Sequence, residues 1–231
     1  MAAFERILYE VEEGVAIITL NRPEKRNCMN PTMHHEMVQV LDELAADPET
    51  KVLVLTGAGD SWCAGQDLRE YFRGLDHATP AEKERASWAA QEWRWRRLNK
   101  FPKPTIAMVN GYCFGGGFTQ LIACDFAIAA DDAIFGLSEV NWGIYPGGMV
   151  SRALAEALNL RKAIYYIMTG DTFDGKEAEA IGLVTKSVPR ERLREETVAL
   201  AKKLMSKNLA TLRACKEVYK TVKSMDYEQA E

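Results

Sequence analysis

The amino-acid sequence predicts an α/β fold with a helical C-terminal region. Three observations predict it: short apolar strands recur through the first half of the chain, capped helical patterns stand between them, and beyond about residue 150 the apolar spacing is mainly helical. The chain has 231 residues, of which 47% are hydrophobic and 27% are charged, so it is long enough for one large domain with its own core.

The first strand is the β-branched run Val15–Leu20, which ends in a turn that contains Pro23. Residues 31–44 follow with apolar side chains at helical spacing, and Asn30 is placed to cap the first turn. Val52–Gly57 is apolar throughout, which is typical of a strand that is buried on both faces. The pattern therefore predicts a strand, a helix and a strand in this order.

The next helix begins at the capping box Thr79-Pro80-Ala81-Glu82 and is expected to run to about Asn99, where a proline-rich segment stops it. Thr105–Val109 and Phe126–Ala130 are the next strands, and the glycines at 115–117 open a helix between them. The apolar markers of the C-terminal helices are Leu154, Leu158, Ile164, Ile167 and Met168.

Residues 93–97, Trp-Arg-Trp-Arg-Arg, mix aromatic and basic side chains, a pattern that also occurs in nucleic-acid-binding proteins. On a regular α-helix, Trp88, Trp95 and Leu98 would share one face, and Glu92 would pair with the arginine four residues later. We therefore expect a packed amphipathic helix, because the whole chain is acidic, with a net charge of −4.

Composition excludes several classes of protein and site. The net charge of −4 gives no electrostatic case for nucleic acid or an anionic membrane, and no apolar run resembles a signal peptide or approaches the ~20 residues of a membrane span. The five cysteines are odd in number and lack a CxxC spacing, so reduced thiols in a cytoplasmic protein are expected. The three histidines form no HExxH and no spaced cluster, so no metal site is predicted.

Two glycine-containing turns follow apolar strands, one at residues 63–68 and the other at residues 110–118. Glycine lets backbone N–H groups approach a ligand closely, and the first amides of a helix have no partner within it. Two such amides that converge on one oxygen would form an oxyanion hole. The alternative is a pair of tightly packed turns without a ligand, and on the glycines alone this alternative is favoured.

Four motifs occur in order along the chain: Asn21-Arg22-Pro23-Glu24-Lys25-Arg26-Asn27, Ala64-Gly65-Gln66-Asp67-Leu68, the glycine-rich residues 111–118, and Phe135-Gly136-Leu137-Ser138-Glu139-Val140-Asn141-Trp142-Gly143-Ile144. Together they resemble the crotonase (enoyl-CoA hydratase/isomerase) superfamily. The resemblance implies a spiral of ββα units, a coenzyme A thioester as substrate and no cofactor. It also implies that the Gln66 and Gly116 amides hold the thioester oxygen while Glu139 moves the protons.

Residues 93–95, 103–111, 137–144 and 165–170 more specifically resemble the hydroxycinnamoyl-CoA (feruloyl-CoA) hydratase-lyases. These enzymes use one glutamate, matched by Glu139, and carry a hydroxyl residue at the position of Thr119, where fatty enoyl-CoA hydratases have a second glutamate. A threonine cannot act as a general base near neutral pH, so this departure counts against a plain hydratase. Tyr71 matches a tyrosine that faces the phenol of the substrate.

The subfamily resemblance implies hydration of a 4-hydroxycinnamoyl-CoA (feruloyl, p-coumaroyl or caffeoyl) and retro-aldol cleavage to acetyl-CoA and an aromatic aldehyde of the vanillin type. It implies a homotrimer or a dimer of trimers, in which a neighbouring subunit supplies a further tyrosine that Tyr227 does not clearly match. The expected division is a crotonase-like core over residues 1–190 and the start of a C-terminal helical oligomerisation region over residues 191–231, which ends before the last helices of the family. The expected substrate-binding residues are Lys25, Ala64, Gly65, Gln66, Asp67, Leu68, Arg69, Tyr71, Gly116, Thr119, Ser138, Trp142 and Gly147.

Several alternatives stay open at this point. A related enzyme could stop at hydration or isomerise a double bond of another acyl-CoA, and a crotonase-like chain could be a non-catalytic scaffolding or RNA-binding protein. For single residues, Glu139 could be a surface or capping carboxylate and Tyr71 a packed loop aromatic. Trp142 could pack in the core, and Lys25 could be a solvated surface charge.

Overall fold

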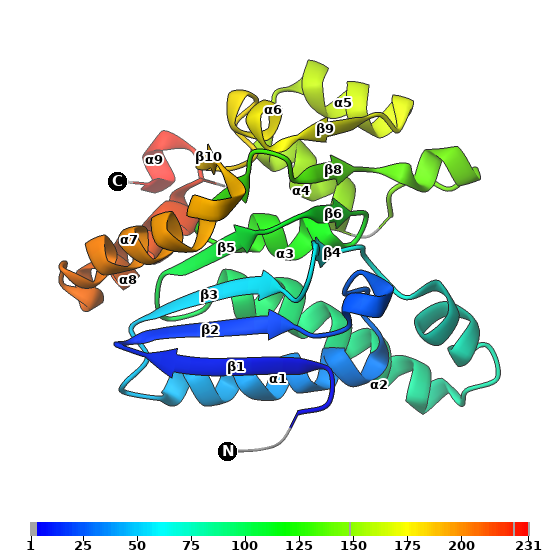
Figure 1. Cartoon of the computed structure of the whole chain (residues 1–231), viewed down its shortest axis with the longest axis horizontal. Coiled ribbons are helices and arrows are strands. Elements are labelled where there is room, and N and C mark those ends of the chain that lie inside the picture. The colour runs from blue at the N-terminus through cyan, green and yellow to red at the C-terminus, as the bar shows by residue number, and fades with distance from the viewer. Residues whose placement is uncertain (1–3, 148, 224, 231) are drawn as a thin grey trace.

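The computed structural model describes residues 4–147, 149–223 and 225–230. Its strands form a six-stranded sheet with the order β1-β2-β3-β5-β7-β10 and a four-stranded sheet with the order β4-β6-β8-β9 (Figure 1). Neighbouring strands are parallel except in the pairs β1–β2 and β8–β9. The strands are β1 (Ile7–Glu12), β2 (Val15–Leu20), β3 (Val52–Gly57), β4 (Ser61–Cys63), β5 (Thr105–Val109), β6 (Tyr112–Phe114), β7 (Phe126–Ala130), β8 (Ile134–Gly136), β9 (Thr172–Asp174) and β10 (Lys186–Val188).

The chain moves between the two sheets in a repeating way. A long strand of the six-stranded sheet is followed directly by a short strand of the four-stranded sheet at β3–β4, β5–β6 and β7–β8. Helical segments then lead to the next long strand. This arrangement confirms the predicted α/β class and the spiral of ββα units with a helical C-terminal region.

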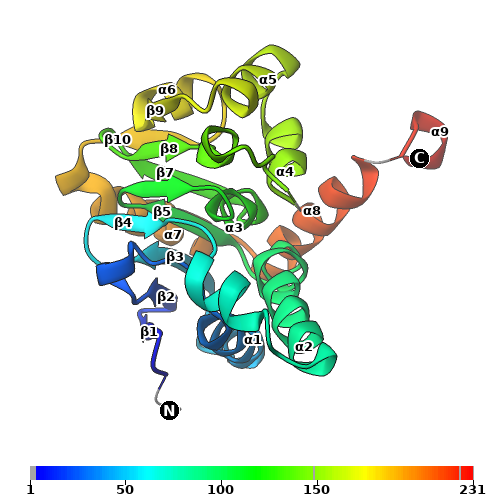
Figure 2. The ribbon, with the colours of Figure 1, turned by 90° about the vertical axis from the view of Figure 1, so that its right-hand side faces the viewer.

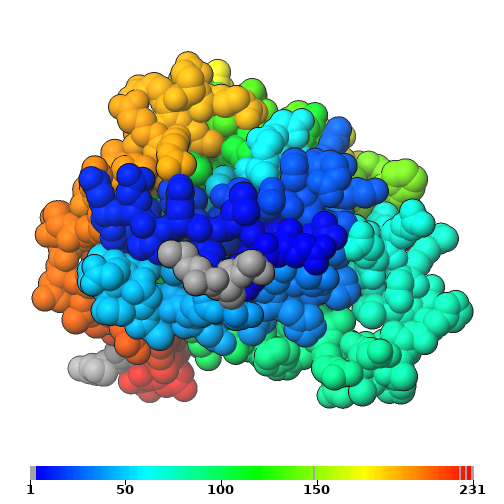
Figure 3. Space-filling model, turned by 60° about the horizontal axis from the view of Figure 1, so that its bottom comes forward, coloured from blue at the N-terminus to red at the C-terminus, as the bar shows by residue number. Residues whose placement is uncertain are grey.

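Helices cover both sheets and end the chain. α1 buries its Met33 and Met37 side chains against the core, and α7 packs against β3, β5 and β7. Figure 3 shows β1 and α1 together on one face of the molecule, and Figure 2 shows α8 leading away from the sheets toward α9. The helices are α1 (Pro31–Ala46), α2 (Pro80–Gln91), α3 (Gly117–Ala123), α4 (Met149–Ala157), α5 (Leu160–Thr169), α6 (Gly175–Ala180), α7 (Leu193–Met205), α8 (Leu209–Val222) and α9 (Tyr227–Ala230).

Local sequence pattern predicts the longer elements correctly. β2, β3, β5 and β7 have the predicted bounds. The Asn30 side chain accepts a hydrogen bond from the Met33 N–H, and Thr79 and Glu82 form the predicted capping box. β1 was not predicted, and neither were the five three-residue strands, which are too short to show a periodicity.

The helix that begins at Pro80 departs from the prediction near its end. It changes to π-helical geometry in η4 (Glu92–Arg97), where hydrogen bonds run over five residues and the side chains turn relative to an α-helix. Trp93 is consequently fully buried, whereas Trp88 is 46% exposed. The predicted packed face through Trp88 is therefore wrong, although the predicted pair between Glu92 and Arg96 forms at 2.7 Å.

Candidate active site

Three neighbouring parallel strands deliver three predicted site residues to one edge of the four-stranded sheet. β4 pairs with β6, and β6 pairs with β8. β4 leads into the turn of Gln66, β6 leads into Gly116, and β8 leads to Glu139 on η5 (Ser138–Trp142). The C-terminal ends of adjacent parallel strands lie at the same sheet edge, so residues from three distant parts of the chain meet there.

The two glycine-containing turns lie in direct contact. Gly65 has a φ of +91°, and a Cβ built on it would lie 3.1 Å from Gly116 N. A residue other than glycine would therefore be strained in its backbone and would push the turns apart. The turn is held from its other side by Met29, whose N–H donates to the Gly65 carbonyl and whose carbonyl accepts from Asp67 N, both at 2.8 Å.

The N–H groups of Gln66 and Gly116 donate to no acceptor among the described residues. The bonds to Met29 use the residues on either side of Gln66 and leave its own N–H unused. Gly116 precedes α3, so its N–H lies outside the hydrogen-bond ladder of that helix. Two unpaired backbone donors on turns in contact are the arrangement that an oxyanion hole requires.

Glu139 places a carboxylate beside these turns. A Cβ built on Gly115, which has a φ of +47°, would lie 2.8 Å from Glu139 Oε1. Glu139 Oε2 and the Thr119 hydroxyl are both buried and have no hydrogen-bond partner. Burial raises the pKa of Glu139 above its ordinary 4.5, although a backbone hydrogen bond opposes part of this effect. A desolvated carboxylate with an unused oxygen is well suited to accept a proton.

The Gly115→Ala variant should lose activity because its methyl group would meet the Glu139 carboxylate. We expect kcat to fall roughly 10-fold or more through displacement of the carboxylate. The positive φ should add a loss of about 1–3 kcal/mol in the free energy of unfolding. Gly182→Ala is the matched control, since Gly182 has a φ of +81° but nothing within 4 Å of the built Cβ. Steady-state kinetics and urea denaturation of both variants check this, and equal kcat values for the two would contradict it.

A buried histidine holds the Gln66 side chain. His34 Nε2 lies 2.8 Å from Gln66 Oε1, and His34 Nδ1 accepts a hydrogen bond from Trp93 Nε1 at 2.7 Å. The indole can only donate, so the proton of the neutral ring is on Nε2 and is directed at Gln66. Burial and the nearby Arg94 charge lower the pKa of His34 to about 3, which keeps the ring neutral. The Tyr71 ring packs edge-on against His34, with ring centroids 5.3 Å apart.

Asp67, predicted to bind substrate, has its carboxylate committed to the protein. It caps η2 (Leu68–Phe72) by accepting from the backbone N–H groups of Arg69 and Glu70 at 2.9 and 2.8 Å. Its other oxygen pairs with the buried Arg22 guanidinium at 3.0 Å. Burial would raise the pKa of Asp67, but these hydrogen bonds together with one from the Cys28 thiol lower it. Its backbone N–H donates to Met29 and its carbonyl accepts from the Tyr71 N–H at 2.9 Å, so Asp67 shapes the turn through contacts within the protein.

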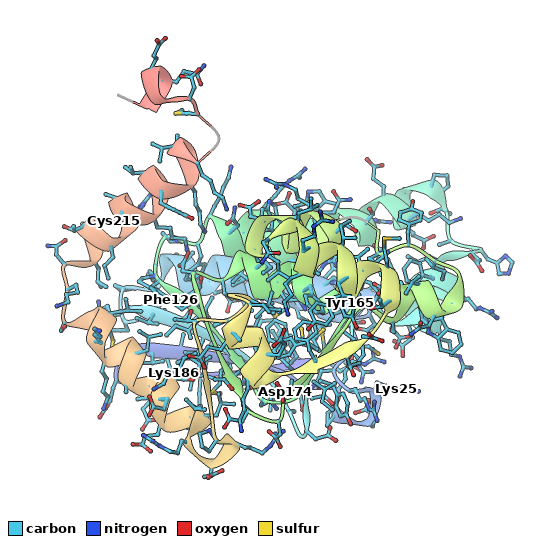
Figure 4. The ribbon with its side chains drawn as sticks, turned by 90° about the horizontal axis from the view of Figure 1, so that it is seen from above. Lys25, Phe126, Tyr165, Asp174, Lys186 and Cys215 are labelled. Carbon is cyan, nitrogen blue, oxygen red and sulfur yellow. The ribbon has the colours of Figure 1, made fainter. Side chains whose placement is uncertain are left out.

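The segment that carries Lys25 lies against the turn that carries Gln66. The Ala64 N–H donates to the Arg26 carbonyl at 2.9 Å, which joins the turn of Gln66 to the segment that carries Lys25. The side chains of Lys25, Leu68 and Arg69 are exposed. Figure 4 shows Lys25 at the edge of the molecule, on the side opposite α8. An extended ligand that reaches the turns from this edge would pass exposed basic groups.

The remaining predicted residues lie on or after η5. Ser138 begins this segment and is part-buried, whereas Trp142 ends it and is 78% exposed. The alternative that Trp142 packs in the core is therefore wrong. Gly147 is exposed in the connection to α4.

Three further findings bear on the predicted exclusions. None of the five cysteines forms a disulfide bond. Within residues 4–147, 149–223 and 225–230, no group of three or more histidine, cysteine, aspartate or glutamate side chains is arranged to hold a metal ion. No helix in this part of the chain is long and apolar enough to cross a membrane.

Sequence reasoning missed His34 and Arg94 as parts of the site. The sequence assigns His34 no role, because its partner Trp93 lies 59 positions away and no local pattern links them. Arg94 did carry a signal: the residues three and four positions away on the helix are Ala90, Gln91, Arg97 and Leu98, none of which is acidic. A basic residue without an acidic neighbour at helical spacing is free to serve another partner.

Comparisons with known proteins agree with this geometry. Residues 10–231 match the family model for enoyl-CoA hydratase/isomerase. The chain is 52% identical over 228 residues to a hydroxycinnamoyl-CoA hydratase-lyase from Pseudomonas fluorescens, which covers 99% of this chain and 83% of the relative. It is 37% identical to a probable enoyl-CoA hydratase from Mycobacterium tuberculosis, over 93% of this chain and 80% of that one. A crystal structure of an enoyl-CoA hydratase from Bacillus anthracis superposes with a TM-score of 0.89 at 29% identity, over 98% of this chain and 86% of that chain. The chain therefore belongs to the enoyl-CoA hydratase/isomerase, or crotonase, family.

Proposed function

We propose that this protein is a lyase that hydrates a 4-hydroxycinnamoyl-CoA and cleaves the product to an aromatic aldehyde and acetyl-CoA. The observation that carries the proposal is Glu139, whose part-buried carboxylate has a buried, unpaired Oε2 and lies beside two unpaired backbone amides, combined with Thr119 where a plain hydratase would have a second carboxylate. The 52% identity to a hydroxycinnamoyl-CoA hydratase-lyase supports the same substrate class.

In the proposed reaction, the thioester carbonyl lies between the Gln66 and Gly116 amides. Glu139 takes a proton from water, which adds to the β-carbon, and the two amides hold the resulting enolate oxygen. Glu139 returns this proton to the α-carbon of the enolate and becomes a carboxylate again. Glu139 next removes the proton of the new β-hydroxyl, the Cα–Cβ bond breaks, and the enolate of acetyl-CoA forms in the same oxyanion hole. Glu139 gives the hydroxyl proton to that enolate, so the two steps together need no redox change, metal ion or other cofactor.

The other predicted residues have proposed roles along the coenzyme A thioester. Lys25 and Arg69 lie near the phosphates, and the backbone of residues 64–68 contacts the pantetheine. Thr119 holds the attacking water through its unpaired hydroxyl. Tyr71 faces the ring hydroxyl, while Ser138, Trp142 and Gly147 line the acyl end of the site. The five unpaired thiols fit a reducing compartment such as the cytoplasm.

Incubation with feruloyl-CoA, followed by mass analysis, tests the proposed function. We expect vanillin and acetyl-CoA in equal amounts. Accumulation of the β-hydroxy thioester alone would instead support the second candidate, an enoyl-CoA hydratase that stops at hydration, which the 37% identical relative favours. If neither feruloyl-CoA nor crotonyl-CoA is converted, the result would support the alternative of a non-catalytic crotonase-like protein.

The protein should form a trimer or a dimer of trimers. The α5 side chains Leu160, Ile164, Tyr165 and Met168 are apolar or aromatic and yet 45–70% exposed. They stand near each other at helical spacing, and a contiguous apolar surface of this kind favours burial between subunits. Light scattering of the protein at micromolar concentration checks this prediction. A purely monomeric mass would contradict it.

A further inference from the structure

The side chain of Arg94 has no acidic partner among the described residues. Its two basic neighbours on η4 are paired, Arg96 with Glu92 at 2.7 Å and Arg97 with Asp42 at 2.8 Å. Arg94 Nε donates only to the Ala90 carbonyl, at 2.7 Å. Of the three arginines on this π-helical segment, Arg94 is thus the one that takes no part in the surface ion pairs.

The Arg94 guanidinium lies where the two glycine-containing turns meet. A Cβ built on Gly116 would lie 3.3 Å from Arg94 Nη1 and 3.6 Å from Gln66 Cγ. The cation therefore stands next to both residues whose amide groups are unpaired. Burial lowers the pKa of Arg94, although the nearby Tyr71 and Cys63 groups oppose this effect. An arginine stays protonated in proteins despite such a shift.

A part-buried cation without a counter-ion destabilises the folded state. The chain nevertheless keeps this charge beside an oxyanion hole, and the proposed reaction forms a negative oxygen there twice, once during hydration and once during cleavage. A fixed positive charge near that oxygen stabilises the enolate more than the neutral thioester, and such differential stabilisation lowers the barrier.

We propose that Arg94 balances the charge of the thioester enolate from behind the Gln66 and Gly116 amides. The inference rests on the proposed enolate chemistry of this site, but not on the identity of the acyl group. The ring oxygen of a hydroxycinnamoyl substrate is the other place where negative charge could develop. The contact of Arg94 with Gly116 favours the enolate oxygen.

Arg94→Met removes the charge and keeps most of the side-chain length. With feruloyl-CoA, kcat should fall about 10- to 100-fold, the range for one hydrogen bond to a charged group, while KM stays within a few-fold. The midpoint of thermal unfolding should be unchanged or higher, because an unpaired cation has been removed. Arg94→Lys should recover part of kcat. Arg96→Met is the matched control on the same π-helical segment and should leave kcat unchanged, because Arg96 is exposed and paired with Glu92.

Binding of acetoacetyl-CoA separates this inference from the proposed function, since its enolate absorbs in the ultraviolet and needs no turnover. The fraction bound as enolate at a fixed pH should fall in Arg94→Met by a factor similar to that for kcat, and binding of butyryl-CoA should not change. An unchanged enolate fraction would overturn the proposal, even if kcat falls. A lower unfolding midpoint with unchanged kcat would also overturn it and make Arg94 a structural residue. Failure of the wild type to convert feruloyl-CoA would reject the proposed function and leave the acetoacetyl-CoA test valid.

Discussion

4-Hydroxycinnamoyl-CoA should be turned over with a kcat/KM about 10⁴-fold higher than that of cinnamoyl-CoA. A site built to hydrogen-bond a hydroxyl leaves its own polar groups unpaired when the analogue lacks that hydroxyl. Withdrawal of the phenolic proton toward Tyr71, or toward a tyrosine of a neighbouring subunit, would also move electrons into the ring and ease bond changes at the β-carbon. The motivating observation is Tyr71, which packs against the same His34 that holds Gln66.

Tyr71→Phe provides the matched test of this discrimination. The variant keeps the ring contact with His34 and removes the hydroxyl, so the preference should fall toward the ~10–200-fold that a pocket reading only apolar bulk can give. Tyr9→Phe on β1 removes a hydroxyl far from the site and should change nothing. Comparable kcat/KM values for the two substrates with the wild type, or faster turnover of crotonyl-CoA, would reject the hydratase-lyase assignment and leave a generic member of the family.

Glu139→Gln should lower kcat at least ~10²-fold, because it keeps the shape of the side chain and removes the group that takes and returns the protons. Binding of the coenzyme A ester should persist, since the Gln66 and Gly116 amides do not depend on that carboxylate. Stopped-flow or steady-state kinetics, together with calorimetric binding of butyryl-CoA, measure the two effects separately. Glu191→Gln, an exposed glutamate in the segment before α7, is the control and should keep wild-type activity. Turnover of Glu139→Gln within a few-fold of wild type would mean that another group moves the protons.

The raised pKa of Glu139 makes a second, signed prediction for the same variant. The folded protein holds this proton more tightly than the unfolded chain, so the wild type loses stability as the pH rises from the ordinary pKa of 4.5 through the raised pKa of the folded state. Glu139→Gln should therefore be at least as stable as wild type at neutral pH, and any advantage should vanish below about pH 4. Chemical denaturation across this pH range tests the sign. In the wild type, the apparent pKa of the acid limb of the pH–rate profile should likewise lie above the ordinary glutamate pKa of 4.5.

The parts of the fold that local physics determines were predictable from sequence. The β-branched run of β2 and the continuously apolar β3 have no stable alternative in a core of this size, and Asn30 and Thr79 mark their helix starts through side-chain caps. The three-residue strands form only because their partners are already in place. The π-helical turn of η4 similarly depends on the burial of Trp93 against His34, which no window of neighbouring residues contains.

The candidate site divides in the same way. Its residue types were found from four ordered motifs, and the fold brings the turns of Gln66 and Gly116 into contact with each other and Glu139 against Gly115. What the motifs could not give is the environment of each group. The buried Glu139 oxygen, the exposed Trp142 and the unpaired Arg94 are properties of packing, so they follow from the tertiary structure and not from spacing along the chain.

The π-helical turn at residues 92–97 also has an evolutionary consequence. Such a turn is what an α-helix becomes when one residue is inserted and its neighbours are held in place. Deleting one residue here would restore a regular helix and rotate the side chains on one side of the deletion by roughly 100° relative to those on the other. Trp93 and Arg94 would then leave the places they occupy beside His34 and Gly116. A relative could thus keep both residue types and still lack a part-buried arginine beside the glycine-containing turns. The length of this segment is therefore as informative as its residues when members of the family are grouped by the reaction they catalyse.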